Sequence, residues 1–379
     1  MFTSTWGAGH VFPMVPLAKA FLAAGHEVYW VASEVACSLV QAAGIDAEVG
    51  GLNAVQVRQA VAEMKEVTAP APAEDRAAIA FPTMFGSAAT PVMVKDLLRI
   101  VRRWKPDMII HEPAELASPI VSALFGIPCI THAWGPAIPS PILSAAGTRV
   151  EHLWAEHGLS VPPFAGLFAN GYLDLCPASL QFVSIEHIVH PQPLRPVPYS
   201  GESRGELPVD LQDSRPLVYV TLGTVFSDYD VLQAAIDGAV GCGAQVLVGV
   251  GPSADPNRIV VRSTGVRVER WVPQPDVFGV ADAVISHTGS GTFLGVLSAG
   301  LPQLCLPQGA DQFRNAHAVT RTGTGIVLSP SEVTAAEVTH SLRLILDDRS
   351  YRVAASRIAS DLAAMPDPAD VVEQLVANH

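Results

Sequence analysis

The stretch "DAVISHTGSGTFLGV" (282–296) joins an apolar run to a histidine and then to a cluster of small residues. Residues 283–286 suit a buried strand, and the Gly-Ser-Gly-Thr run at 289–292 suits a tight turn that opens a helix. Such a turn lets backbone N–H groups and a helix N-terminus face an anion, beside the imidazole of His287. The stretch therefore predicts a phosphate-binding strand–turn–helix unit, with an ordinary tight turn as the alternative.

The same alternation of apolar runs and helical patterns extends through the whole chain. Apolar runs that end in small or polar residues occupy 26–33, 106–113 and 128–135, and then 216–224, 245–251, 267–273, 282–289 and 302–308. Strands that are apolar on both faces and separated by helices indicate parallel sheets covered on both sides. We therefore predict an α/β protein with two doubly wound, Rossmann-like domains facing one cleft.

The domain boundary is predicted from length and composition. The chain has 379 residues, which exceeds the usual size of a single hydrophobic core. Residues 200–216 are polar and rich in glycine, proline and charge, as expected of an interdomain linker. The predicted order is an N-terminal domain over 1–200, a linker over 201–216, a C-terminal domain over 217–355 and terminal helices over 356–379.

Composition excludes several classes of protein. The net charge of −13 argues against a nucleic-acid surface, which needs clustered basic residues. The apolar runs are shorter than the ~20 residues of a membrane span and no basic-then-apolar leader opens the chain. The first glycine turn follows Met1 so closely that we expect the first strand to begin upstream of it. A homodimer is left open.

Cysteine usage indicates the compartment. The five cysteines are far apart and odd in number, form no CxxC pair, and lie partly within apolar runs. They are Cys37, Cys129, Cys176, Cys242 and Cys305. This pattern is typical of reduced core residues in a cytoplasmic protein.

Candidate site residues are those that end the apolar runs, because ligands of open parallel sheets bind beyond the carboxyl ends of the strands. They are His10, Glu112, Thr224, Trp271, His287 and the segment 308–312. The "LGT" turn at 222–224 is a second candidate for phosphate binding.

An ordered set of motifs then resembles a known family. The motifs are "GAGHVFPMVPLAKAFLAAGHEV" (7–28), "WVPQ" (271–274), "HTGSGT" (287–292) and "GADQFRNA" (309–316). Together they resemble the family-1 glycosyltransferases of the GT-B fold, in the bacterial branch that attaches sugars to antibiotic-type natural products. The resemblance implies that the N-terminal domain binds the acceptor and the C-terminal domain binds a nucleotide sugar. It also implies that the final segment, 367–379, returns to the N-terminal domain, which the spacing of Val371, Val372, Leu375 and Val376 supports.

On the acceptor side, the resemblance implies two catalytic residues. His10 would be the general base that takes a proton from the acceptor hydroxyl, and Glu112 would orient it in place of the family's usual aspartate. A neutral imidazole held by a carboxylate suits base catalysis near pH 7. The alternative is that His10 only caps a helix starting near Pro13.

On the donor side, the resemblance implies a set of binding residues. Trp271 would stack on the nucleobase while Val272 offers it backbone groups, and Asp311 with Gln312 would bind hydroxyls of the donor sugar. The pyrophosphate would lie against Thr224, His287, Gly289, Ser290, Gly291 and Thr292. As alternatives, Trp271 could be a buried aromatic residue and Asn315 a residue that only caps or packs.

One departure from related families bears on the nucleotide. Plant-type UDP-sugar enzymes carry a glutamate eight residues after the histidine, where it binds ribose hydroxyls, whereas this chain has Gly295. A site without that acceptor favours a deoxyribose, so we predict a dTDP-sugar donor rather than a UDP-sugar.

No cofactor or metal ion is expected. Asp228 and Asp230 have the DxD spacing of some manganese sites, but they open a predicted helix, where Ser227 or Asp228 suits an N-cap. The pairs His152 with His157 and His187 with His190 lack partners at zinc spacing.

The predicted reaction is an inverting, metal-independent transfer of a deoxysugar to a hydroxyl of a hydrophobic aglycone such as a polyketide. The apolar segments 77–90 and 133–147 suggest such an acceptor, without identifying it, the sugar or the linkage. The alternatives are a catalytically inactive auxiliary protein of the same fold and a nucleotide-sugar epimerase or hydrolase. A dehydrogenase is disfavoured because "GAGH" lacks the third glycine of the dinucleotide fingerprint.

Overall fold

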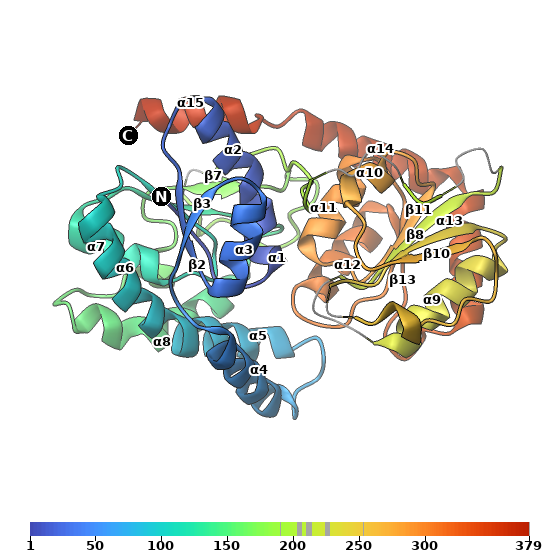
Figure 1. The fold of residues 1–379 in the computed structure, drawn as a ribbon, viewed down its shortest axis with the longest axis horizontal. Coiled ribbons are helices and arrows are strands. Elements are labelled where there is room, and N and C mark those ends of the chain that lie inside the picture. Colours follow the sequence, from blue (N-terminus) through green and yellow to red (C-terminus); the bar gives the residue numbers. More distant parts are fainter. Residues whose placement is uncertain (190, 203–206, 210–213, 224–227, 253, 379) are drawn as a thin grey trace. The chain divides into compact units, whose positions relative to one another are not determined.

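The computed structural model describes residues 1–189, 191–202, 207–209, 214–223, 228–252 and 254–378. The chain divides into two compact units. The first consists of Met1–Arg195 together with Met365–His379, and the second of Pro196–Ala364. In each unit one parallel sheet has helices on both faces (Figure 1). Thr224, one of the candidate phosphate ligands, lies outside the described residues, as do Ser227 and His190.

The first unit is built on a seven-stranded sheet of order β3-β2-β1-β4-β5-β6-β7, with every neighbouring pair parallel. Its strands are β1 (Phe2–Thr3), β2 (Tyr29–Ala32), β3 (Asp46–Val49), β4 (Ile109–His111), β5 (Cys129–His132), β6 (Tyr172–Asp174) and β7 (Pro191–Pro193). Its helices are α1 (Ala8–Val11), η1 (Phe12–Met14), α2 (Val15–Ala23), α3 (Glu34–Ala42), α4 (Ala54–Thr68), α5 (Arg76–Phe81), η2 (Pro82–Ala89), α6 (Thr90–Trp104), α7 (Ala117–Phe125), α8 (Ser140–Ala155), η3 (Pro163–Gly166) and α15 (Pro368–Asn378).

The second unit is built on a six-stranded sheet of order β10-β9-β8-β11-β12-β13, again entirely parallel. Its strands are β8 (Leu217–Thr221), β9 (Gln245–Gly249), β10 (Val266–Glu269), β11 (Ala283–Ser286), β12 (Gln303–Cys305) and β13 (Gly325–Val327). Its helices are α9 (Tyr229–Gly241), η4 (Pro256–Arg258), α10 (Gln274–Phe278), α11 (Ser290–Ser298), α12 (Gln312–Thr322), α13 (Ala335–Asp347) and α14 (Arg349–Ala363).

Successive side chains of β8 enter the cores on opposite faces of the sheet, which explains why the sequences of such strands are continuous apolar runs. Val218 and Val220 join a core under α9 and α13, whereas Leu217 and Tyr219 join a core on the opposite face with α10 and α11. Successive side chains of a strand point to opposite faces, so both faces of this strand must be apolar. The two doubly wound sheets predicted from the sequence are confirmed, and so is each of the eight predicted strands.

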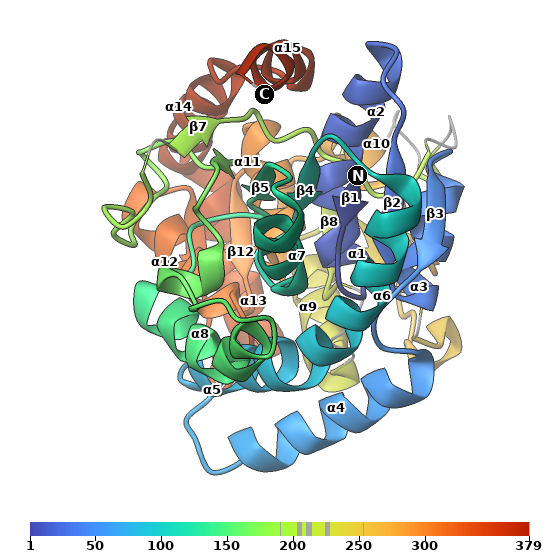
Figure 2. The ribbon, with the colours of Figure 1, turned by 90° about the vertical axis from the view of Figure 1, so that its left-hand side faces the viewer.

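Helix α6 carries the strongest apolar stripe of the first unit. Leu97, Ile100 and Val101 are buried in its core, and Figure 2 shows α7 lying across β4 and β5 beside it. Among the described residues, one stretch, Arg76–Trp104, is long and apolar enough to span a membrane by length and composition. Part of this stretch is buried, since Phe81, Met93 and Val94 belong to the core of the first unit.

The terminal helix α15 belongs to the first unit, where it packs on α2. Val371, Val372 and Leu375 are buried, as their spacing predicts. The prediction was wrong for Val376, which is 45% exposed. It lies one residue after Leu375, about 100° further round the helix, and this takes its side chain off the buried stripe.

Candidate active site

Both sheets place their candidate residues at the point where the strand order reverses. β1 and β4 are neighbours from which the chain continues in opposite directions across the first sheet, and β8 and β11 have the same relation in the second. Ligands of doubly wound sheets bind beyond the carboxyl ends of such strands. His10 and Glu112 follow β1 and β4, and Gly223 and His287 follow β8 and β11.

His10 lies in the last turn of α1 and meets the carboxylate of Glu112. The imidazole Nδ1 and the Glu112 Oε1 are 3.2 Å apart, and the side chain of His10 is 20% exposed. The two atoms are thus at ion-pair distance. The helices that begin near Pro13, η1 and α2, have Val11 and Met14 as their N-caps, so the alternative role of His10 as a cap there is wrong.

Glu112 is fully buried and fixed by donors from two loops. Its Oε1 accepts from the backbone N–H and the hydroxyl of Thr5, at 3.0 and 2.8 Å, and its Oε2 accepts from the N–H of Ala114 at 2.6 Å. Burial alone would raise the pKa of Glu112, but His10 and the donors on Ala114 and Thr5 outweigh it and hold the pKa below its usual value. The residue is therefore a carboxylate near neutral pH.

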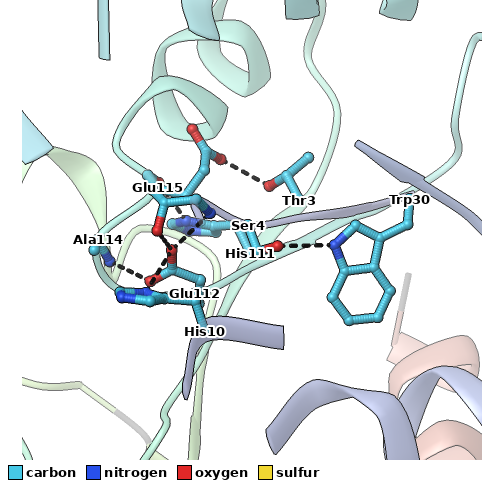
Figure 3. A network of polar contacts seen from close by, with 9 residues as sticks. Thr3, Ser4, His10, Trp30, His111, Glu112, Ala114 and Glu115 are labelled. Atoms are coloured by element: carbon cyan, nitrogen blue, oxygen red, sulfur yellow. Dashed lines mark hydrogen bonds and ion pairs between the residues drawn. The ribbon is translucent and has the colours of Figure 1, made fainter. Parts of the chain in front are cut away.

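A second buried layer supports this pair (Figure 3). The carboxylate of Glu115 accepts from the Thr3 hydroxyl at 2.7 Å and from the N–H of Ala117 at 2.8 Å, at the start of α7. His111 bridges the Glu115 carbonyl, 2.8 Å from Nδ1, and the Thr131 hydroxyl, 2.9 Å from Nε2. Burial lowers the pKa of His111. These bonds tie β1, β4, β5 and α7 together directly behind Glu112.

Aromatic side chains surround the imidazole of His10. Trp134 meets it edge-to-face at a centroid distance of 4.7 Å, and Phe85 lies 5.4 Å away. Trp6 and Phe81 in turn contact Phe85 at 5.4 and 5.1 Å. Aromatic residues such as these offer a large apolar surface beside the exposed part of the ring.

The segment that carries Phe85 is a π-helix. Within η2 the N–H of Thr90 reaches the carbonyl of Phe85, five residues back. Gly86 allows α8 to approach closely, because a Cβ there would lie 2.8 Å from the Cβ of Arg149. Wide turns of this kind are rare and often occur at functional sites.

In the second unit, the imidazole of His287 is wedged between two glycines. A Cβ built on Gly223 or on Gly289 would lie 2.5 Å from the His287 Nε2. Gly223 also has a φ of +80°, which disfavours any side chain. The chain at Gly223 and the "HTGSG" turn thus converge on one ring.

His287 is a neutral side chain. Burial lowers its pKa to about 4, despite the attraction of the Asp311 carboxylate. At neutral pH its imidazole is therefore uncharged, with one ring nitrogen that donates and one that accepts.

The N-terminus of α11 is partly occupied by protein groups. The Asp311 Oδ2 accepts from the backbone N–H of Ser290 at 3.1 Å and from its hydroxyl at 2.5 Å. The first-turn N–H groups of a helix have no partner within the helix. Gly291 and Thr292 are the next two such donors of α11.

The remaining donor-side candidates also make internal contacts. The hydroxyl of Thr292 accepts from the Gln274 side chain at 2.9 Å, and the Trp271 indole donates to the Ser200 carbonyl at 2.9 Å. Trp271 is half-buried and Val272 fully buried. Gln312 is buried, and its Oε1 accepts from the N–H groups of Gln308 and Gly309 at 2.6 and 3.0 Å.

The DxD spacing is a helix cap. The side chain of Asp228 accepts from the N–H groups of Asp230 and Val231, at 3.1 and 3.2 Å, at the start of α9. The capping interpretation is confirmed for Asp228. Within the described residues, no group of three or more His, Cys, Asp or Glu side chains could hold a metal ion.

Several residues of the site were not predicted. Thr5 and Ala114 donate to Glu112, and Thr3 and Glu115 form the layer behind it. The run "HEPAE" at 111–115 already carried a signal, since two glutamates three residues apart follow a strand. Asn315 was considered only as a cap or packing residue. Its amide reaches three acceptor atoms, on Thr288, Ser290 and Asp311.

Two parallel-sheet domains of this strand order, one with a histidine–carboxylate pair and the other with a histidine–glycine turn, are those of a GT-B glycosyltransferase. Family models cover residues 19–223, as the N-terminal domain, and 235–378, as the C-terminal domain, of "Erythromycin biosynthesis protein CIII-like" proteins. The chain belongs to this family of bacterial natural-product glycosyltransferases. It is therefore a sugar-transferring enzyme.

Individual relatives agree with this assignment. The L-demethylnoviosyl transferase of Streptomyces niveus is 32% identical over 100% of this chain and 97% of its own. The 3-alpha-mycarosylerythronolide B desosaminyl transferase of Saccharopolyspora erythraea is 27% identical over 100% of this chain and 98% of its own. The crystal structure of the Streptomyces sp. SF2575 glycosyltransferase SsfS6, complexed with thymidine diphosphate, is 27% identical, covers 100% and 99% of the two chains, and has a TM-score of 0.80.

Proposed function

We propose that this glycosyltransferase transfers a deoxysugar from a dTDP-sugar to a hydroxyl group of a hydrophobic natural-product aglycone, such as a polyketide, in the cytoplasm. The observation that carries the proposal is the convergence of two glycine turns on the neutral imidazole of His287, beside the open N–H groups of α11. Such an arrangement suits a diphosphate, which needs hydrogen-bond donors and a helix N-terminus.

On the acceptor side, His10 would remove the proton of the attacking hydroxyl. The buried carboxylate of Glu112 would hold the ring and stabilise the imidazolium that forms. The aromatic contacts of Trp134 and Phe85 with His10 support a hydrophobic acceptor. The relatives that transfer noviose-type and desosamine sugars support a deoxysugar.

The reaction would be a single in-line displacement that inverts the anomeric centre. The acceptor oxygen attacks the anomeric carbon as the bond to the diphosphate breaks, and the acceptor proton passes to the His10 imidazole. The N–H groups of Gly291 and Thr292, with His287, would stabilise the negative charge on the departing diphosphate. Trp271 with Val272 would hold the base, and Asp311 with Gln312 the sugar.

The preference for thymidine diphosphate rests on Gly295. A Cβ at this position would lie 2.7 Å from the Phe278 ring, so Phe278 fills the space that a longer side chain would need. No carboxylate can extend from this position toward a ribose 2′-hydroxyl without displacing that ring. The complex of SsfS6 with thymidine diphosphate supports the same nucleotide.

Titration calorimetry of dTDP and UDP against the wild-type protein and the His287→Ala variant tests the proposal. We expect dTDP to bind more tightly than UDP, and the substitution to weaken dTDP binding about tenfold because a hydrogen-bond donor is lost. Tighter binding of UDP would contradict the nucleotide assignment. If neither nucleotide bound, the auxiliary-protein alternative would be favoured.

We also propose that no metal ion takes part. The carboxylate of Asp228 already accepts two N–H groups of α9, which supports a capping role over a manganese site. Turnover is therefore expected to be unchanged after treatment with EDTA. Loss of activity in EDTA that Mn²⁺ restores, but Na⁺ does not, would show that the diphosphate needs a cation.

A further inference from the structure

Asn315 lies at the centre of the polar contacts behind the turn. The residue is fully buried in α12, one helical turn after Asp311. Its Nδ2 is 2.9 Å from the carbonyl oxygen of Thr288, 3.1 Å from the Ser290 hydroxyl and 3.0 Å from the Asp311 Oδ2. One amide therefore joins the turn, the first residue of α11 and the residue that precedes α12.

The turn that this amide holds is a strained one. Thr288 has a φ of +60°, in the left-handed region that β-branched residues avoid. Its N–H donates to the Ser286 hydroxyl at 3.1 Å, and its own hydroxyl donates to the carbonyl oxygens of His287 and Gln312, at 2.6 and 3.2 Å. Together with these hydrogen bonds, the one from the Asn315 amide to the Thr288 carbonyl maintains this backbone conformation.

Burying the side-chain amide of Asn315 is unfavourable in free energy. Its Oδ1 is buried without a hydrogen-bond partner among the described residues, and burying such an acceptor is unfavourable. An apolar side chain of similar size would avoid that cost. The contribution of Asn315 must therefore come from the three contacts of its Nδ2.

Asp311 acts together with this amide. Its Oδ2 receives the Asn315 Nδ2 and both the N–H and the hydroxyl of Ser290. This oxygen is committed to contacts within the protein. Only Oδ1 of the same carboxylate is left to meet a hydroxyl of the donor sugar.

We infer that Asn315 is a positioning residue for the diphosphate. Through Thr288 and Ser290 it fixes the direction of the first turn of α11, and so aims the N–H groups of Gly291 and Thr292. The inference rests on the proposed function, since it assumes that a nucleoside diphosphate binds at this turn.

The test exchanges the amide of Asn315 and the carboxylate of Asp311. Asn315→Leu and Asn315→Asp are each expected to weaken dTDP binding, measured by calorimetry, by about tenfold or more. The leucine variant loses the hydrogen bonds to the turn, and the aspartate variant places a second carboxylate against that of Asp311. The double variant Asp311→Asn with Asn315→Asp restores one amide and one carboxylate at this place. A carboxylate at position 315 still faces the Thr288 carbonyl and cannot donate to it, so we expect this double variant to bind dTDP more tightly than Asn315→Asp but less tightly than the wild type.

Gln233→Leu is the matched control. This side chain also makes three hydrogen bonds in the second unit, to Val260 twice and to Asp237, but it lies on α9. The control should bind dTDP as the wild type does. Near-ultraviolet circular dichroism of every variant verifies that the fold is retained.

The possible outcomes distinguish the proposed function from the inference about Asn315. A wild-type protein that does not bind dTDP overturns the proposed function, and the inference with it. If the wild type binds dTDP and the folded single variants bind it equally well, the inference about Asn315 alone is overturned. The same holds if the double variant binds no better than Asn315→Asp.

Discussion

Replacing His10 with alanine is expected to lower turnover by roughly 100-fold to 10,000-fold, the usual contribution of a general base. The binding of dTDP should stay close to that of the wild type, because His10 and the turn around His287 belong to different units. The measurement is kcat with a transferable donor and acceptor, together with calorimetry of dTDP on the same preparation.

Two further variants sharpen this result. Glu112→Gln keeps the size of the side chain but removes the charge that faces the imidazole, so a smaller loss of turnover is expected. His152 is exposed on α8, and His152→Ala should leave kcat unchanged. Unchanged turnover in His10→Ala would exclude His10 as the base.

Replacing Gly289 with alanine is expected to impair both nucleotide binding and the stability of the second unit. The backbone at Gly289, with φ −59° and ψ 143°, suits any residue, so the only obstacle is space. The added Cβ would lie 2.5 Å from the His287 Nε2 and must push the ring away. Overpacking of this kind costs about 1–3 kcal/mol, and a displaced ring should weaken dTDP binding at least about tenfold.

Gly279→Ala is the matched control for this variant. An added Cβ at Gly279 makes only ordinary contacts, the nearest at 3.7 Å from the Asp276 carbonyl oxygen. Thermal unfolding and dTDP calorimetry are measured for both variants. If Gly289→Ala melted and bound dTDP as Gly279→Ala does, the ring of His287 would not be held by the two glycines.

The fold was predictable where strands are buried on both faces. All eight apolar runs proposed as strands are strands, and seven of them lie in the interior of their sheets, whereas β10 lies at an edge. The other edge strands, β3, β7 and β13, escaped the prediction, and so did the buried interior strand β6. The half-exposed β3 reads "DAEV", and β7 reads "PQP", whose prolines lack the N–H groups that a strand normally donates.

The π-helix η2 was not predictable either. Its hydrogen bonds run to the fifth residue back, and the close packing of Gly86 against α8 accompanies that geometry. Nothing in the local sequence distinguishes it from an α-helix.

The candidate site was predictable as a set of residues, but not as a set of contacts. The position of His10 and Glu112 after strands indicated their roles, whereas the 3.2 Å between them depends on β1 and β4 being neighbours in the sheet. Asn315 was undervalued because its acceptors on Thr288 and Ser290 lie 27 and 25 residues earlier in the chain. Only the folded arrangement of α11 and α12 brings these atoms together.

The membership of α15 in the first unit has a consequence for the order of folding. As the ribosome delivers the chain, all of the second unit emerges before the helix that packs on α2. The inserted unit can therefore fold while the surrounding one still lacks a helix, and the surface of α2 that contacts α15 stays uncovered until α15 has emerged. The first unit is therefore completed after the second, although it begins earlier in the chain.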